Sequence, residues 1–514
     1  MTVDDLGPVL LAGALVLLAA VFAVRLSVRT GLPSLLVYLG FGLLIGEDGL
    51  GLEFDDERLT GILGYAALVL ILAEGGLTTR WSRIKDSVGA AAVLATVGTV
   101  VSIGVVGTAC HYLLGLSWTM ALLIGAVVSS TDAAAVFSVL RGLPLPPRLV
   151  GMLEAESGFN DAPVVIAVVA LTEIAAHPGD PGHPWWLLVL EAVGELAIGA
   201  VVGYAVGRLG GVALGRVALP ASGLYPIAVI ALVVAAYGTA DVLHGSGFLA
   251  TYVAGLALGN VRLPHGAAVR GFAEGLGWLA QIGLFVMLGL LADPARLPDH
   301  VGTALVVGLV LLLLGRPLSV LASATWFRIP LREQAFLSWA GLRGAVPVVL
   351  ATVPATAGLA DAESIFDLVF VLVVVFTLVQ GPTLPWVARR LSLSDGVTSV
   401  DLDVESSPLG ALDADVVQMR IGPTSKLHGV EIFELRLPEG CNITLVVRDG
   451  KPFVPTLRTM LRHGDELIVV ASASARPVAE RRLREVSADG KLAGWYKRLG
   501  PDALRPGFRT RPRP

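Results

Sequence analysis

Three acidic residues lie inside two neighbouring apolar stretches of the chain. Asp132 lies within residues 121–140, and Glu156 and Asp161 lie within residues 154–171. A charged side chain at the centre of a bilayer costs about 2.5–3.5 kcal/mol on insertion scales, so it needs a partner or a function. Hydroxyl and amide side chains accompany the acids: Ser129, Ser130, Thr131, Ser157 and Asn160. This combination predicts a site for a cation and a proton.

Asp161 is the residue that we expect to carry the transported ion. Burial disfavours the charged form of a carboxyl group. Such a group can therefore hold either a proton or a dehydrated monovalent cation, but not both, and that exclusion is the basis of antiport. The preceding Asn160 is neutral, so the pair supplies one titrating charge and predicts electroneutral exchange of one proton for one cation. The alternative is a structural Asp161 paired with a basic residue.

Thr131, Asp132 and Ser157 are the further predicted ligands of the cation. Alkali cations bind several oxygen atoms, as the harder divalent cations do. Ser157 precedes Asp161 by four residues, which places both on one face of a helix. In the alternative interpretation, the hydroxyl groups only cap broken helix ends and Asp132 only compensates a helix N-terminus.

Glu156 and Arg343 are predicted to form a buried ion pair with a structural or gating role. Arg343 is the one basic residue deep within its apolar stretch, and arginine is effectively always charged. Removal of one partner would leave the other charge buried and unpaired. Glu74 is predicted to be a further polar neighbour of the site, or alternatively an acid that reaches toward the membrane surface.

The composition is that of a membrane protein. Of the 514 residues, 54% are hydrophobic and only 15% are charged, whereas soluble domains carry about 25% charged residues. The net charge of −5 gives no indication of a nucleic-acid partner. Asp4 and Asp5 occupy the place of the basic region of a signal peptide, so the first apolar stretch is expected to remain as a helix. Cys110 and Cys441 indicate no disulfide framework.

Thirteen apolar stretches are predicted to cross the lipid bilayer. They lie near residues 8–25, 31–46, 59–77, 87–115, 118–140, 155–176, 185–214, 223–241, 244–262, 273–292, 300–327, 333–358 and 364–388. Nearly all basic residues of the connections follow odd-numbered stretches, and only Arg58 and Arg296 follow even-numbered ones. The positive-inside rule then predicts an N-terminus outside the cell and a C-terminus in the cytoplasm.

The spacing of the stretches predicts two inverted halves. Stretches 5 and 6 correspond to stretches 12 and 13, and an odd offset turns one half upside down relative to the other, as in many secondary transporters. Stretches 5 and 12 are interrupted by residues 129–132 and by Gly341–Pro347. Glycine and proline there favour broken helices whose ends could bind ions. Alternatively, these residues are simply frequent in membrane helices.

Stretch 7 carries a glycine every four residues: Gly199, Gly203, Gly207, Gly211 and Gly215. Small residues at that spacing line one helical face and allow close backbone approach. The stripe could pack inside the chain or between two copies of it.

A soluble region follows the apolar stretches. Residues 391–414 are polar and acidic and are predicted to be a linker. Residues 415–485 contain short alternating segments separated by turn residues, which predicts a small α+β domain. Residues 486–514 include a basic, proline-rich tail that is expected to be largely disordered.

Several motifs, taken together, resemble those of a known protein family. The segments AEGGL (73–77), SSTDAAAVF (129–137), EAESGFNDAPVV (154–165) and GLRGAVPVVLA (341–351) resemble the cation/proton antiporter superfamily, in particular its electroneutral NhaP-type branch. The resemblance covers about residues 1–390.

This resemblance implies an all-α fold of about thirteen membrane helices in a homodimeric exchanger, with core and dimerisation domains. It implies that Asp161 is the carrier, that Thr131, Asp132 and Ser157 contribute to the ion site, and that Glu156 pairs with Arg343. It also implies a transporter of the bacterial inner membrane, without enzymatic activity and with no cofactor besides the transported ions.

Residues 415–485, with SKLHGVEIFELRLP and LRHGDELIVV, resemble TrkA-C regulatory domains. With this domain attached, the chain resembles bacterial potassium/proton antiporters, so K⁺ is the preferred substrate, with Na⁺ or Rb⁺ as further candidates. A small molecule or a nucleotide is the expected kind of regulator.

Three rival functions fit the sequence less well than antiport. A regulated channel is disfavoured because no TVGYG-like filter is present. An aspartyl protease using Asp132 and Asp161 fits the surrounding hydroxyl groups less well than ion binding does. A solute symporter would need an enlarged polar pocket, which the sequence does not indicate.

Overall fold

A computed structural model describes residues 6–30, 33–46, 49, 51, 57–132, 135–136, 145–177, 184–393, 402–409, 414–472, 475–491 and 493. The chain divides into two units, Met1–Ser394 and Asp395–Pro514. Each unit has its own hydrophobic core, so each is described by itself.

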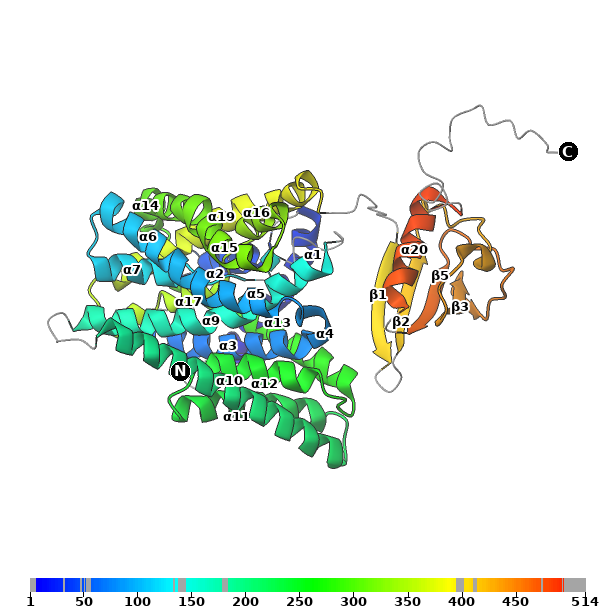
Figure 1. The fold of residues 1–514 in the computed structure, drawn as a ribbon, viewed down its shortest axis with the longest axis horizontal. Helices are drawn as coiled ribbons and strands as arrows, with labels where there is room; N and C mark the ends of the chain where they lie inside the picture. The colour runs from blue at the N-terminus through cyan, green and yellow to red at the C-terminus, as the bar shows by residue number, and fades with distance from the viewer. Residues whose placement is uncertain are drawn as a thin grey trace. The chain divides into compact units, whose positions relative to one another are not determined.

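The described part of the first unit is helical (Figure 1). Its N-terminal half contains α1 (Leu6–Thr30), α2 (Ser34–Ile45), α3 (Glu57–Thr78), α4 (Trp81–Ile84), α5 (Val88–Val93), η2 (Leu94–Gly98), α6 (Thr99–Leu114), α7 (Trp118–Val127) and α9 (Pro147–Ala176). Its C-terminal half contains α10 (Trp185–Arg216), α11 (Leu224–Val242), α12 (Gly247–Gly259), α13 (Gly266–Leu291), α14 (Leu297–Val310), η3 (Leu311–Gly315), α15 (Arg316–Ala324), η4 (Thr325–Phe327), α16 (Leu331–Trp339), α17 (Ala345–Leu350), α18 (Val353–Thr356) and α19 (Ala362–Arg390).

The apolar helices coincide with the predicted stretches. Among the described residues, eight helices are long and apolar enough to cross a membrane. Shorter apolar helices occupy residues 13–24, 34–45, 118–127, 247–259 and 345–356. A bilayer core of about 30 Å needs about 20 helical residues. The membrane-protein fold is therefore confirmed, whereas the number of thirteen crossings stays a prediction.

Two of the predicted stretches are broken helices. α7 ends at Val127, and residues 128–132 are not helical; most of the remainder of that stretch lies outside the described residues. In stretch 12, residues 340–344 separate α16 from α17. Pro347 lies in the first turn of α17, where the missing N–H group leaves no hydrogen bond unmade. The proline therefore marks the start of the second half-helix.

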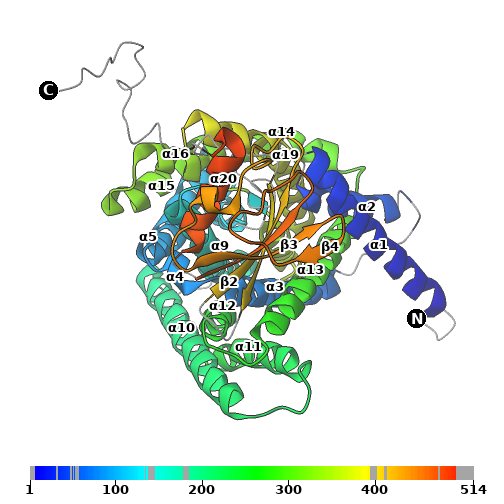
Figure 2. The ribbon, with the colours of Figure 1, turned by 90° about the vertical axis from the view of Figure 1, so that its right-hand side faces the viewer.

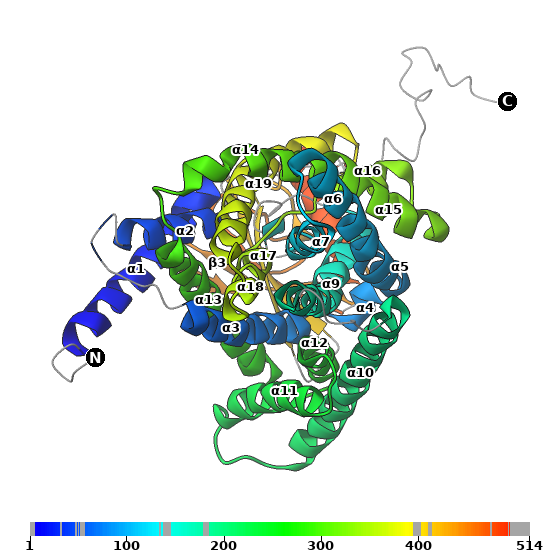
Figure 3. The same cartoon turned by 90° about the vertical axis from the view of Figure 1, so that its left-hand side faces the viewer.

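The two breaks lie in the interior of the first unit. Figure 3 shows α7, α9 and α17 side by side in the middle of the helices, and these three elements contact one another. α10 and α11 lie at the edge of the unit, with α12 between them and α3 (Figures 2 and 3). The helices that carry the predicted site are thus enclosed by other helices.

The glycine stripe of α10 packs inside the chain. An added Cβ atom would lie 2.5 Å from the carbonyl oxygen of Ser246 at Gly199, and 2.5 Å from that of Ala250 at Gly203. At Gly207, it would lie 2.6 Å from the Cβ atom of Ala257. These neighbours belong to α12 or to its N-cap, so the stripe permits close contact between α10 and α12.

The second unit is a five-stranded antiparallel sheet with short helices, as expected for a small α+β domain. The strand order is β1-β2-β5-β3-β4. Its elements are β1 (Leu402–Leu409), β2 (Ala414–Ile421), η5 (Ile432–Leu435), β3 (Cys441–Arg448), β4 (Lys451–Phe453), β5 (Glu466–Ser472) and α20 (Arg476–Asp489). The core includes Met419, Val446, Leu467 and Leu483.

The second unit has regular structure beyond the predicted residues 415–485 at both ends. Residues 402–409, assigned to the linker, form the strand β1, which pairs with β2 along its whole length from Leu402↔Ile421 to Leu409↔Ala414. Backbone hydrogen bonds hold an edge strand without requiring apolar side chains, so the polar composition was misleading. At the other end, α20 continues to Asp489, and residues 494–514 lie outside the described part.

Candidate functional site

Asp161 lies in the middle of α9 and is buried, with 6% of its surface exposed. Its carboxylate accepts a hydrogen bond of 2.6 Å from the hydroxyl group of Ser130. Pro163, inside the same helix, has no N–H group to donate to the carbonyl of Phe159. The predicted carrier therefore lies against the break that follows α7, in a helix with an interrupted hydrogen-bond ladder.

Hydrogen bonds connect the two broken stretches directly. The backbone N–H of Asp132 donates to the carbonyl of Leu342 at 2.9 Å. Nη1 of Arg343 donates to the carbonyl oxygens of Ser129 and Ser130, at 3.0 and 2.6 Å. Both serines follow the last residue of α7, Val127, so Arg343 places its positive charge just beyond the C-terminal end of this helix. A cation is favourable there, because the helix C-terminus carries partial negative charge.

Asp132, in the first break, packs tightly against Gly344 in the second break. Its Oδ1 accepts a hydrogen bond of 3.2 Å from the backbone N–H of Ala135, as a capping residue does. An added Cβ atom at Gly344 would lie 1.9 Å from Oδ2 of Asp132. Asp132 thus makes a hydrogen bond of the kind found at helix N-termini, while its other carboxylate oxygen faces Gly344.

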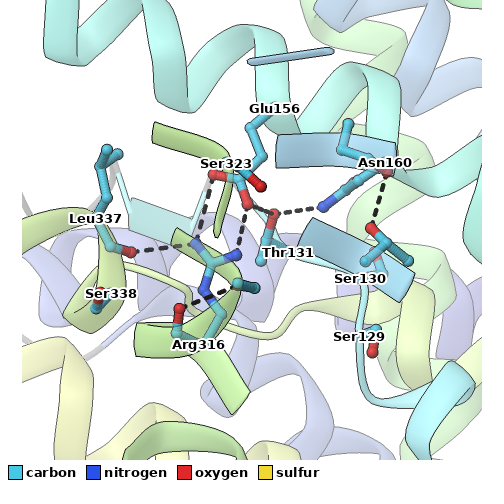
Figure 4. Close-up of polar contacts among 12 residues, drawn as sticks. Ser129, Ser130, Thr131, Glu156, Asn160, Arg316, Ser323, Leu337 and Ser338 are labelled. Carbon is cyan, nitrogen blue, oxygen red and sulfur yellow. Dashed lines mark hydrogen bonds and ion pairs between the residues drawn. The ribbon is translucent and has the colours of Figure 1, made fainter. Parts of the chain in front are cut away.

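Thr131 and Asn160 connect the break to α9. The side-chain amide of Asn160 donates to the hydroxyl oxygen of Thr131 at 2.6 Å. The Thr131 hydroxyl in turn lies 3.5 Å from Oε1 of Glu156 (Figure 4). Oδ1 of Asn160 is buried and has no hydrogen-bond partner among the described residues. Ser157, half-buried, lies one helical turn before Asp161, as predicted.

Glu156 is paired with Arg316 and not with Arg343, so the predicted ion pair is wrong. Nη1 of Arg316 lies 2.6 Å from Oε1 of Glu156, and Nη2 also donates to the carbonyl of Leu337 at 3.1 Å (Figure 4). Arg343 is instead held by the carbonyl groups at the end of α7.

Arg316 is the residue that the sequence reasoning missed. It follows the π-helical turn η3, in which an extra residue per turn changes the direction of the side chains that follow. A signal was present, because Arg316 is a charge inside the apolar stretch 300–327.

Glu74 does not join this cluster. An added Cβ atom at Gly277 of α13 would lie 3.1 Å from the Cβ atom of Glu74, so the side chain faces α13. Among the described residues, its carboxylate bonds to the hydroxyl of Thr78 at 3.4 Å and not to any residue around Asp161.

The charges around Asp161 balance without it. The cluster contains the acids Asp132 and Glu156 and the bases Arg316 and Arg343. Ionised, these four side chains sum to zero. Ionised Asp161 would add one negative charge that these four side chains do not balance.

A cavity lies beside the C-terminal half of α9. Its volume is about 910 Å³. Its lining starts at Val165, one helical turn after Asp161, and includes the acids Glu173, Glu195 and Asp241 and the aromatic ring of Phe248. The carboxylates give the cavity a negative field that attracts cations.

Comparisons with known protein families match both units. The family model for the transmembrane sodium/hydrogen exchanger matches residues 14–390, and that for the TrkA-C domain matches residues 416–484.

Comparisons with individual proteins give similar results. The chain is 37% identical to the K(+)/H(+) antiporter NhaP of Alkalimonas amylolytica over 476 residues, which is 91% of this chain and 82% of that protein. It is 35% identical over 480 residues to NhaP2 of Shewanella oneidensis, with the same coverage. It is 29% identical to the Na(+)/H(+) antiporter ApNhaP of Aphanothece halophytica, over 72% of this chain and 74% of that one.

A solved structure shares the fold. The sodium proton antiporter MjNhaP1 from Methanocaldococcus jannaschii superposes with a TM-score of 0.66 at 22% sequence identity. The superposition covers 75% of this chain and 99% of that one.

Proposed function

This chain belongs to the transmembrane sodium/hydrogen exchanger family, and on that basis we propose that it exchanges cytoplasmic K⁺ for H⁺ across the bacterial inner membrane. Relatives with 37% and 35% identity are named K(+)/H(+) antiporters, which supports potassium. The relative named for Na⁺ is 29% identical, so Na⁺ is the alternative substrate.

The observation that carries this proposal is the position of Asp161. A buried carboxylate bonded to a hydroxyl group at a helix break can bind a dehydrated cation together with neighbouring oxygen atoms. Asp132, Thr131 and Ser157 are the proposed further ligands. Asn160 precedes Asp161 in the chain. Its side-chain amide oxygen is buried and has no hydrogen-bond partner among the described residues.

The balance of charge supports electroneutral exchange. Asp132, Glu156, Arg316 and Arg343 sum to zero, so Asp161 with a proton and Asp161 with K⁺ leave the cluster equally neutral. Net charge in the interior of a membrane protein is expensive. Exchange of one proton for one monovalent cation therefore leaves no net charge in the cluster in either loaded state, which keeps the free energy of both states low.

The cavity beside α9 is the proposed route from Asp161 to the outer surface. The distribution of basic residues predicts that the N-terminus and the C-terminal end of α9 lie outside the cell. In this orientation, Glu173, Glu195 and Asp241 attract cations at the outer side.

Association and regulation are also proposed. Exposed apolar side chains cover α1 and α10, among them Leu10, Phe22, Val201 and Leu209. These faces suit lipid or a second copy in a homodimer. The second unit is the proposed receptor for a small-molecule or nucleotide regulator.

Proton flux in proteoliposomes tests the proposal. K⁺, Na⁺, Rb⁺ and Li⁺ are offered separately to the wild type, to Asp161→Asn, and to Asp361→Asn as a control for an exposed carboxylate. The proposal requires K⁺-driven proton flux in the wild type and the control, and none in Asp161→Asn. Exchange retained by Asp161→Asn would overturn it, and a response to Na⁺ alone would replace potassium by the alternative.

A further inference from the structure

A small cavity of about 10 Å³ lies between the two arginines of the cluster. Arg316, Gly341, Arg343 and Gln380 supply its polar and backbone lining, and Leu312 and Phe376 contribute to the apolar part. Its polar lining therefore comes from the start of α15, the break between α16 and α17, and the middle of α19.

The arginines have unused hydrogen-bond donors. Nε of Arg316 and both Nε and Nη2 of Arg343 have no partner among the described residues. The two residues are only 4% and 2% exposed. A buried donor without a partner costs about 1–3 kcal/mol, and more when the group is charged. Unpaired donors of two guanidinium groups at one small cavity call for a guest that accepts hydrogen bonds.

We infer that this cavity binds a single water molecule, which accepts hydrogen bonds from Arg316 and Arg343. Gln380 uses Nε2 to donate to the carbonyl of Trp339 at 3.0 Å, so its amide oxygen can accept a hydrogen bond from this water. The guest then has donors and an acceptor, as buried waters usually have.

Volume and charge both favour water over a halide ion. A water molecule needs at least about 10–15 Å³ of such space, so this cavity has room for one and no more. A chloride ion is larger. It would also add one negative charge to a cluster in which Asp132 and Glu156 already balance Arg316 and Arg343, and such a charge is expensive in a membrane interior.

The water would act on exchange by positioning Arg343. Nη1 of Arg343 holds the carbonyls of Ser129 and Ser130, and the hydroxyl of Ser130 binds Asp161. A water molecule bound to the remaining nitrogens of Arg343 would therefore also hold the segment after α7 in place beside Asp161. Gln380 and this water are positioning groups, since neither contacts Asp161 in the described hydrogen bonds. This consequence for exchange rests on the proposed function, whereas the binding of the water does not.

A density map of the full-length protein tests the binding directly. Electron cryo-microscopy at a resolution that shows ordered water is carried out in potassium chloride, potassium bromide and potassium gluconate. We expect one peak within hydrogen-bonding distance of Arg316 and Arg343, with the same height in all three salts. A cavity without density would overturn the inference, and so would a peak that grows in bromide or disappears in gluconate.

Substitution tests the positioning role. An added Cβ atom at Gly341 would lie 2.5 Å from Nε of Arg316, so Gly341→Ala competes with the guest. Gly302→Ala on α14 is the control, because nothing lies within 4 Å of its added Cβ atom. Gln380→Leu removes the proposed acceptor without adding bulk at Arg316. It replaces Gly341→Ala in this experiment if Gly341→Ala does not fold.

In Gly341→Ala, we expect the density peak to disappear and the K⁺ concentration at half-maximal exchange to rise several-fold. In the control Gly302→Ala, we expect the wild-type K⁺ concentration at half-maximal exchange. Loss of the peak with unchanged K⁺ dependence would overturn the positioning role. The peak is measured without transport, so failure of the proposed function and failure of this inference give different results.

Discussion

Nη1 of Arg316 lies 2.6 Å from Oε1 of Glu156, and both side chains are almost completely buried. The pair joins α9 to the turn after η3, and the Thr131 hydroxyl contacts the same oxygen of Glu156. Glu156 is therefore held in a buried ion pair, and Asp161, five residues further along α9, remains the acid that we propose to exchange its guest.

Arg316→Met is expected to destabilise the protein strongly. Loss of one partner from a buried ion pair costs about 3–5 kcal/mol, because the other charge stays buried and unpaired. Thermal unfolding in detergent measures the change. The double variant Glu156→Leu/Arg316→Met should recover most of the lost stability. The combination Glu156→Leu/Arg343→Met should not, and recovery there instead would show that Arg343 is the true partner.

Gly344→Ala is expected to abolish or greatly reduce exchange. Its Cβ atom would lie 1.9 Å from Oδ2 of Asp132, so either the carboxylate or the break must move. Overpacking of this kind costs about 1–3 kcal/mol. Gly283→Ala is the control, because an added Cβ atom there meets nothing within 4 Å. Proton flux in proteoliposomes compares the two, and equal rates would mean that Asp132 has no fixed place in the site.

The broken helices and the buried position of Asp161 could be predicted from the sequence because their signals are local. Apolar stretches interrupted by Gly341–Pro347 or by acids and hydroxyl groups indicate the break and the site without knowledge of packing. The structure then brings Ser130 and Thr131 to the helix that carries Asp161.

Partners across helices could not be predicted in this way. The sequence predicted Arg343 as the partner of Glu156, because only the packing of η3 against its neighbours brings Arg316 to this carboxylate. Likewise, nothing in the composition of residues 402–409 reveals that β2 offers a free edge for them.

Gly203→Val is expected to lower stability by about 1–3 kcal/mol through overpacking. The substituted side chain would meet the backbone of Ala250 in α12, which an added Cβ atom at Gly203 already approaches to 2.5 Å. Gly215→Val belongs to the same stripe but has open space, so it should be neutral. Thermal unfolding and the oligomeric state in detergent are measured together. Dissociation into monomers by Gly203→Val, without loss of monomer stability, would place the stripe between subunits instead.

Arg448→Ala is expected to destabilise the second unit. Asp465 is fully buried, and Arg448 donates to both of its carboxylate oxygens at 2.8 Å. These hydrogen bonds raise the pKa of the Arg448 guanidinium above its ordinary value. The loss should approach the about 3–5 kcal/mol typical of a broken buried pair.

Arg420→Ala supplies the comparison for this variant. Arg420 lies 3.9 Å from Glu466, and their side chains are 66% and 37% exposed. A solvent-accessible pair of this kind contributes about 0–1 kcal/mol. Denaturant unfolding of the isolated second unit measures both variants. Similar losses in the two would contradict the structural role of Asp465.

The most direct test of the central claim is the number of protons released when K⁺ binds to the purified protein in weakly buffered detergent solution. Starting from a pH at which Asp161 holds a proton, the account predicts one proton released for each K⁺ bound, and neither binding nor release in Asp161→Asn. K⁺ binding without proton release, or release that persists in Asp161→Asn, would contradict a single carboxylate that holds the two ions in turn.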